Sequence, residues 1–101
     1  MIADGFLGLA EASELLRARK LSPVELIRAQ LARIERLDPT FHAFIRVTPE
    51  IALAAARQAE AEINAGGWRG PLHGIPVGLK DIIDLAGVPT TGHSKILIDN
   101  V

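Results

Sequence analysis

At Gly66 the sequence changes from residues with helical spacing to a stretch rich in glycine and proline, and this change limits the possible folds more than any other feature. The stretch from Gly66 to Gly78 holds five glycines and two prolines, so it cannot form a continuous helix. The residues before Gly66 instead follow helical spacing. We therefore expect a helical part over about residues 1–66. An ordered glycine loop and a lysine-bearing strand should follow over about residues 67–101.

Helix start signals precede Gly66 at two places. Ser22-Pro23 offers a capping hydroxyl and a proline at the first helical position, with Glu25 placed to close a capping box. An apolar stripe follows at spacings of three and four: Val24, Ile27, Leu31 and Ile34. Asp38-Pro39 should end this helix. A shorter helix is expected before it, from Leu9 to about Lys20, and an alanine-rich one after Thr48-Pro49.

Strands are expected around and after the glycine loop. Phe41–Val47 is aromatic and partly β-branched, and Ile75–Leu79 has the composition of a buried strand. The predicted fold class is therefore α/β, with N-terminal helices and the first strands of a mixed sheet. The apolar ending Ile96–Val101 would leave that sheet with open edges, so we expect the natural chain to continue and the sheet to be incomplete here.

The composition of the chain argues against several classes of function. Eleven basic and twelve acidic side chains give a net charge of −1, which offers no basic surface for nucleic acid or membrane lipid. The chain has no cysteine, no secretory signal and no apolar run near the roughly 20 residues that span a bilayer, so we expect a cytoplasmic protein. No metal or cofactor is expected, because His42, His73 and His93 are too scattered for a metal motif.

Lys80 is the candidate catalytic residue. At the end of a buried strand, the ammonium would lose hydration and its pKa would fall, so that the neutral amine could act as a general base. The alternative is an ordinary exposed lysine paired with Asp81. A phosphate-binding loop is excluded, because Asp81 stands where that motif needs a serine or threonine. The hydroxyls of Thr90, Thr91 and Ser94 are expected to bond local backbone groups.

Two stretches resemble the amidase-signature family: Gly70-Pro71-Leu72-His73-Gly74-Ile75-Pro76-Val77-Gly78-Leu79-Lys80-Asp81 and Gly87-Val88-Pro89-Thr90-Thr91-Gly92. The upstream order of elements is similar as well. The resemblance implies a Ser–cis-Ser–Lys triad in which Lys80 is the lysine, and it makes Asp81 a positioning residue for the surrounding loops. It also makes residues 1–101 the N-terminal portion of a single amidase domain.

The family's glycine- and serine-rich signature has no match here. The serines are Ser13, Ser22 and Ser94, and none has a Gly-Gly-Ser context. The resemblance therefore implies a fragment that is inactive alone, from an amidase that hydrolyses a carboxylic amide to acid and ammonia. Its partners would be a small-molecule amide and the remainder of the chain, with a homodimer left open. The alternatives are the A subunit of a tRNA-dependent amidotransferase and a non-catalytic binding module.

Overall fold

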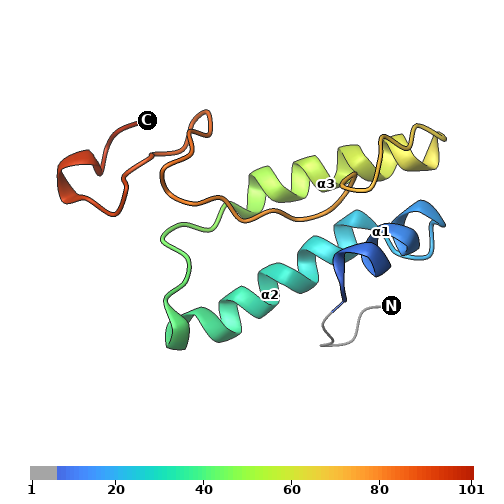
Figure 1. Ribbon diagram of the computed structural model, residues 1–101, viewed down its shortest axis with the longest axis horizontal. Helices are drawn as coiled ribbons and strands as arrows, with labels where there is room; N and C mark the ends of the chain where they lie inside the picture. Colours follow the sequence, from blue (N-terminus) through green and yellow to red (C-terminus); the bar gives the residue numbers. More distant parts are fainter. Residues whose placement is uncertain (1–6) are drawn as a thin grey trace.

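Three α-helices form most of the regular structure in residues 7–101, the part of the chain that this computed structural model describes. They are α1 (Leu9–Arg17), α2 (Pro23–Phe41) and α3 (Pro49–Asn64), and a single 3-10 turn, η1 (Lys95–Leu97), follows near the end. Helices α2 and α3 pack side by side, and α1 lies beside the start of α2 (Figure 1). The residues after α3 run back along the helices, and the chain ends on the side of the molecule opposite to the end of α3 (Figure 1).

The start of α2 was predicted correctly, and its cap also connects two helices. The Ser22 hydroxyl accepts the backbone N–H of Val24 at 3.1 Å, which satisfies one of the free amides at the helix start. The same hydroxyl donates to the carboxylate of Glu60 on α3. Ser22 thus fixes where α2 begins and ties that end to the neighbouring helix.

The predicted end of α2 at Asp38-Pro39 is wrong. The helix passes through Pro39 and continues to Phe41. Its last turn is closed by Asp38, whose carbonyl accepts the N–H of His42 at 2.7 Å. The Asp38 carboxylate Oδ1 accepts the next two N–H groups, those of Ala43 at 2.6 Å and Phe44 at 3.0 Å. These bonds satisfy the backbone beyond the proline, so the helix does not need to stop before it.

The core of the described region lies where α1 meets α2. Leu16 is fully buried there, together with Ala12, Leu21 and Leu26. Helix α1 ends at Arg17 and not near Lys20, because the chain reverses at Arg19, which has a φ of 59°. The N–H of Lys20 then bonds the carbonyl of Leu15 at 2.9 Å, closing the turn.

The predicted strands are absent from residues 7–101. Phe41 belongs to α2, and residues 43–47 and 75–79 are irregular. The only ladder contact in the described chain is one antiparallel bridge between Leu85 and Val88. The α/β prediction is thus met here for its helices alone. A strand exists only when a second strand satisfies its backbone groups, and no other part of residues 7–101 supplies one.

Candidate functional site

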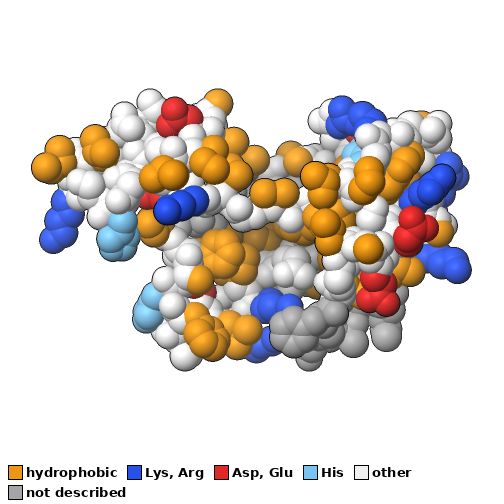
Figure 2. Space-filling view, in the orientation of Figure 1, with side chains coloured by type: hydrophobic (Ala, Val, Ile, Leu, Met, Phe, Trp, Pro, Cys, Tyr) orange, Lys and Arg blue, Asp and Glu red, His pale blue; other side chains and the backbone are white. Residues whose placement is uncertain are grey.

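A broad apolar cleft runs between the helices and the segment that follows them. Its floor and walls come from α2, α3, residues 43–48 and residues 69–93. The hollow is visible in the middle of Figure 2, with hydrophobic side chains around it. Its volume of about 1530 Å³ exceeds the roughly 300–1,000 Å³ of ordinary small-molecule pockets. A surface of this size and composition suits a layer of polypeptide better than a small ligand alone.

The apolar stripe predicted on α2 faces this cleft and not a closed core. Ile27, Leu31 and Ile34 line the cleft and are only half buried. On α3 the cleft is lined by four alanines: Ala56 and Ala59 are buried, Ala52 is half exposed and Ala55 is exposed. Both helices therefore keep apolar surface that residues 7–101 do not cover.

Lys80 lines the same cleft, at the end of the irregular segment that begins at Ile75. Its side chain is exposed, as are Val77 and Leu79 just before it. The expectation that Lys80 ends a buried strand is therefore wrong for this structure. The physical reason is the missing sheet: without a pairing strand or a covering layer, residues 77–80 stay in solvent.

Asp81, the next residue, is fixed by a turn that lies ten residues farther along. Its Oδ1 accepts the backbone N–H of Thr91 at 2.9 Å, and its Oδ2 accepts the Thr91 hydroxyl. The N–H of His93 also donates to Oδ2, at 3.3 Å, and the Asp81 carbonyl accepts the N–H of Gly92 at 2.8 Å. The Asp81 side chain is thus engaged with Thr91 and His93 and does not serve as a counter-ion for Lys80.

These bonds favour the charged form of Asp81. The Thr91 hydroxyl is the largest cause, followed by the Thr91 backbone N–H, and together they hold the Asp81 pKa below its usual value. Thr91 is buried, and its hydroxyl also accepts the N–H of His93 at 3.1 Å. The expected local role of the Thr91 hydroxyl is confirmed, but its main partner was missed. An acid followed ten residues later by a threonine in a glycine turn was the only available signal.

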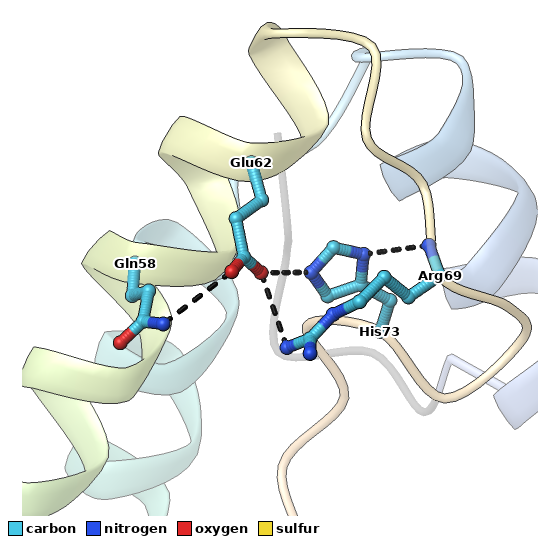
Figure 3. Close-up of polar contacts among 4 residues, drawn as sticks. All are labelled: Gln58, Glu62, Arg69 and His73. Atoms are coloured by element: carbon cyan, nitrogen blue, oxygen red, sulfur yellow. Dashed lines mark hydrogen bonds and ion pairs between the residues drawn. The ribbon is translucent and has the colours of Figure 1, made fainter.

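Two contacts anchor the segment that holds Lys80: the Asp81–Thr91 contact after it, and a contact of His73 with α3 before it (Figure 3). The His73 Nδ1 accepts the backbone N–H of Arg69 at 3.1 Å, so this nitrogen carries no proton. The proton is therefore on Nε2, which donates to Glu62 Oε1 at 2.8 Å. The His73 side chain is only 4% exposed. Both ring nitrogens are thus satisfied in a nearly dry site.

The Glu62 carboxylate interacts with two further donors besides His73. The Gln58 amide donates to Oε2 at 3.3 Å from one turn earlier on α3, and the Arg69 guanidinium lies 3.2 Å from Oε1 (Figure 3). The hydrogen bond from His73 is the largest cause that lowers the Glu62 pKa. The Arg69 side chain is 70% exposed, so that ion pair adds little. The sequence showed no sign of this cluster, because Glu62 looks like any solvated residue of an alanine-rich helix.

The histidines do not form a metal site within residues 7–101, where no group of three or more metal-ligating side chains occurs. His42 caps the end of α2 with a φ of 51°, and His93 belongs to the Asp81 turn. Trp68 packs against the core between α1 and α2, and its ring centroid lies 5.9 Å from that of His73. None of the helices in this part of the chain has the length and hydropathy needed to cross a bilayer.

Known proteins resemble this chain in the region that carries the two anchors. Residues 25–101 match the family model described as Amidase, which covers both anchors and Lys80. The chain belongs to the amidase family. The resemblance seen in the glycine motifs is thereby confirmed, and it extends over most of α2 and all of α3.

Several named relatives are similar to this amidase chain over nearly its whole length. A Mycobacterium tuberculosis protein with the provisional name amidase AmiD is 44% identical over 93 residues, which are 92% of this chain and 20% of that protein. The A subunit of glutamyl-tRNA(Gln) amidotransferase from Geobacter metallireducens is 53% identical over 91 residues, 90% of this chain and 19% of its own length. The corresponding protein of Chloroflexus aggregans is 48% identical over 92 residues, 91% of this chain and 19% of its own length.

The amidase chain thus spans about a fifth of the length of the curated relatives that it matches. No solved structure matches it. Within that fifth, Lys80 lies between His73, which bonds Glu62 of α3, and Asp81, which bonds Thr91.

Proposed function

We propose that this chain is the N-terminal portion of a single amidase domain and supplies Lys80 as the base of a hydrolase. The full enzyme would convert a carboxylic amide to acid and ammonia. The observation that carries the proposal is the family match over residues 25–101, which includes the glycine loop, Lys80 and Asp81. The placing of Lys80 on the wall of the apolar cleft supports it.

In the mechanism that the family resemblance implies, the neutral Lys80 amine takes a proton from a nucleophilic serine through a bridging cis-serine. The serine oxygen then attacks the amide carbonyl, and the proton held by Lys80 passes to the nitrogen as the C–N bond breaks, so that ammonia leaves. Water then hydrolyses the acyl-enzyme, which releases the acid and restores the serine hydroxyl. Neither serine is matched by Ser13, Ser22 or Ser94. A base without nucleophile and oxyanion donors cannot give acyl transfer, so we expect residues 1–101 alone to be inactive.

The cleft supports a further part of the proposal, that the remainder of the amidase domain packs there. Such a layer would cover the half-exposed stripe of α2 and the exposed side chains of residues 77–83. It would also supply the strands that residues 43–47 and 75–79 lack, giving the α/β fold. Lys80 would then lie in a drier site, where the charged ammonium is less favoured than in this structure.

The alternative within the family is the A subunit of an amidotransferase. Relatives with that name match 90–91% of this chain, against 92% for the amidase relative, and at similar identity. A non-catalytic module, which would use the glycine loop for binding, is the alternative of another class. The family match through Lys80 and the fixed geometry on both sides of it favour the catalytic proposal over this module.

The experiment that tests the proposal is a chimera in which this chain replaces the matching residues of the Mycobacterium AmiD protein. Ammonia release is measured over a panel of carboxylic amides. We expect turnover by the chimera and a loss of about 10⁴-fold or more in Lys80→Ala, the scale seen for removal of one member of a catalytic triad. Lys20→Ala is the matched control, since Lys20 is an exposed lysine outside the cleft. Near-normal turnover by folded Lys80→Ala would contradict the proposal.

A further inference from the structure

His73 is a buried titratable group for which the proposed mechanism has no use. Its side chain is 4% exposed, and its two nitrogens bind the backbone of Arg69 and the carboxylate of Glu62. A buried imidazole with both nitrogens engaged has no free atom for a substrate. Any part that His73 plays in catalysis must therefore act through the position of another residue.

The chain between His73 and Lys80 is short and firmly attached at its start. Gly74 has a φ of +84°, and a Cβ built on it would lie 3.1 Å from Pro23 Cγ and 3.4 Å from Leu16 Cδ1. The backbone therefore passes directly over the junction of α1 and α2. Ile75 then packs against the same core, and the chain becomes exposed from Val77 onward.

We propose that the His73–Glu62 contact is a positioning device for Lys80. This inference rests on the proposed function. Helix α3 holds His73, and the α1–α2 junction holds Gly74 and Ile75, so only residues 76–79 separate these held positions from Lys80. At the far side, Thr91 holds Asp81. Lys80 thus lies between two anchored residues, His73 and Asp81, which are held by different parts of the fold.

Figure 3 shows why His73 and not Arg69 carries the anchor. The imidazole is inserted between α3 and the loop backbone, and it bonds both. The Arg69 guanidinium reaches the same Glu62 oxygen from solvent, with 70% of its side chain exposed. Loss of the Arg69 side chain would leave the bridge between loop and helix in place, whereas loss of the imidazole would remove it.

The test uses the active chimera and measures kcat and KM separately for His73→Ala and Glu62→Ala. A displacement near 1 Å at a reacting group can cost about a hundredfold in rate. We expect kcat to fall about tenfold to a hundredfold in each variant, with KM within about twofold, because the base moves while the binding surface does not. The double variant should be no slower than either single one, since both remove the same contact.

His73→Gln is the conservative variant, because its amide can still donate to Glu62, and it should recover most of the lost kcat. Glu14→Ala is the matched control on an exposed glutamate of α1 and should leave kcat unchanged. Amide hydrogen exchange at Arg69 gives a readout independent of activity and should become faster in His73→Ala, because Nδ1 is the acceptor of that N–H.

Each failure points to a different conclusion. Unchanged kcat in folded His73→Ala and Glu62→Ala, or a change in KM alone, would overturn the positioning role while Lys80→Ala still tests the proposed function. Unfolding of both variants would make this a folding contact and would also overturn the inference. Full activity in Lys80→Ala would instead remove the proposed function itself, whatever His73 does.

Discussion

The hydroxyl and the backbone N–H of Thr91 both donate to the carboxylate of Asp81, so one residue occupies both oxygens of the acid that follows Lys80. The segment between them is thereby closed into a loop of fixed size. Asp81 was expected to act as a positioning residue, and this contact shows which part of the chain it holds.

This contact predicts how Asp81 titrates. Because its folded-state pKa is lowered, Asp81 contributes stability above its unfolded pKa of about 3.9, and the contribution is lost as pH falls through the lower folded value. Thr91→Val removes the hydroxyl, which is the largest cause. We expect the pKa of Asp81 to rise toward its usual value in that variant, measured by NMR titration of the carboxyl carbon.

Thr90→Val is the matched control for this titration. Thr90 is the neighbouring hydroxyl residue and contacts Asn100 through its backbone groups, not Asp81. Its substitution should leave the Asp81 titration unchanged. If Asp81 titrates at the same pH in the Thr91→Val variant and in the wild type, the side-chain bond does not exist in solution.

A second prediction compares two glycines with nearly the same φ angle. Gly74 has a φ of +84° and Gly66 a φ of +85°, so alanine meets the same left-handed strain at both, about 1 kcal/mol or somewhat more. Only Gly74 has neighbours, with Pro23 Cγ 3.1 Å from the built Cβ, whereas Gly66 has nothing within 4 Å. Urea unfolding should therefore show a larger loss of stability for Gly74→Ala than for Gly66→Ala. Equal losses would mean that the loop does not lie against α2.

A third prediction concerns Ser22, which caps α2 and also bonds α3. Ser22→Ala should reduce the free energy of unfolding by about 1 kcal/mol, the usual cost of losing such a cap. Glu60→Ala removes only the interhelical partner. A double-mutant cycle, measured by urea unfolding, should give a coupling energy between Ser22 and Glu60. Ser94→Ala is the control, because it loses only an exposed cap at η1. Strict additivity would show that the two helices are not joined here.

The parts of the fold that were predicted correctly depend on neighbouring residues. Ser22-Pro23 and Thr48-Pro49 each mark the first turn of a helix, because capping and the fixed φ of proline act within four residues. At Thr48 the start was correct, although its side chain makes no capping bond. Lys80 was selected from the pattern of its own segment; the family match covers that segment, and the catalytic role of Lys80 stays a prediction.

The wrong strand predictions and the missed contacts involve partners that are distant in the sequence, whereas the wrong ends of α1 and α2 have local causes. The strands at 41–47 and 75–79 were inferred from composition, but a strand needs a second strand that residues 7–101 do not contain. The Glu62–His73 bond joins residues on opposite sides of the Gly66 turn, and no spacing rule connects them. The exposure of Lys80 follows from the same missing neighbours.

The wrong end of α2 gives the last prediction. A proline disfavours the helical conformation of the residue before it. The helix nevertheless continues through Asp38, because the Asp38 carboxylate accepts the N–H groups of Ala43 and Phe44 beyond Pro39. Asp38→Ala leaves those two amides without this acceptor, so the end of α2 should fray back toward residue 38, at a cost of about 1 kcal/mol in unfolding free energy. Asp38→Asn keeps an acceptor oxygen and should retain most of the helix end. Amide hydrogen exchange at Ala43 and Phe44 measures both effects, and equal protection in Asp38→Ala and the wild type would show that some other contact carries the chain past the proline.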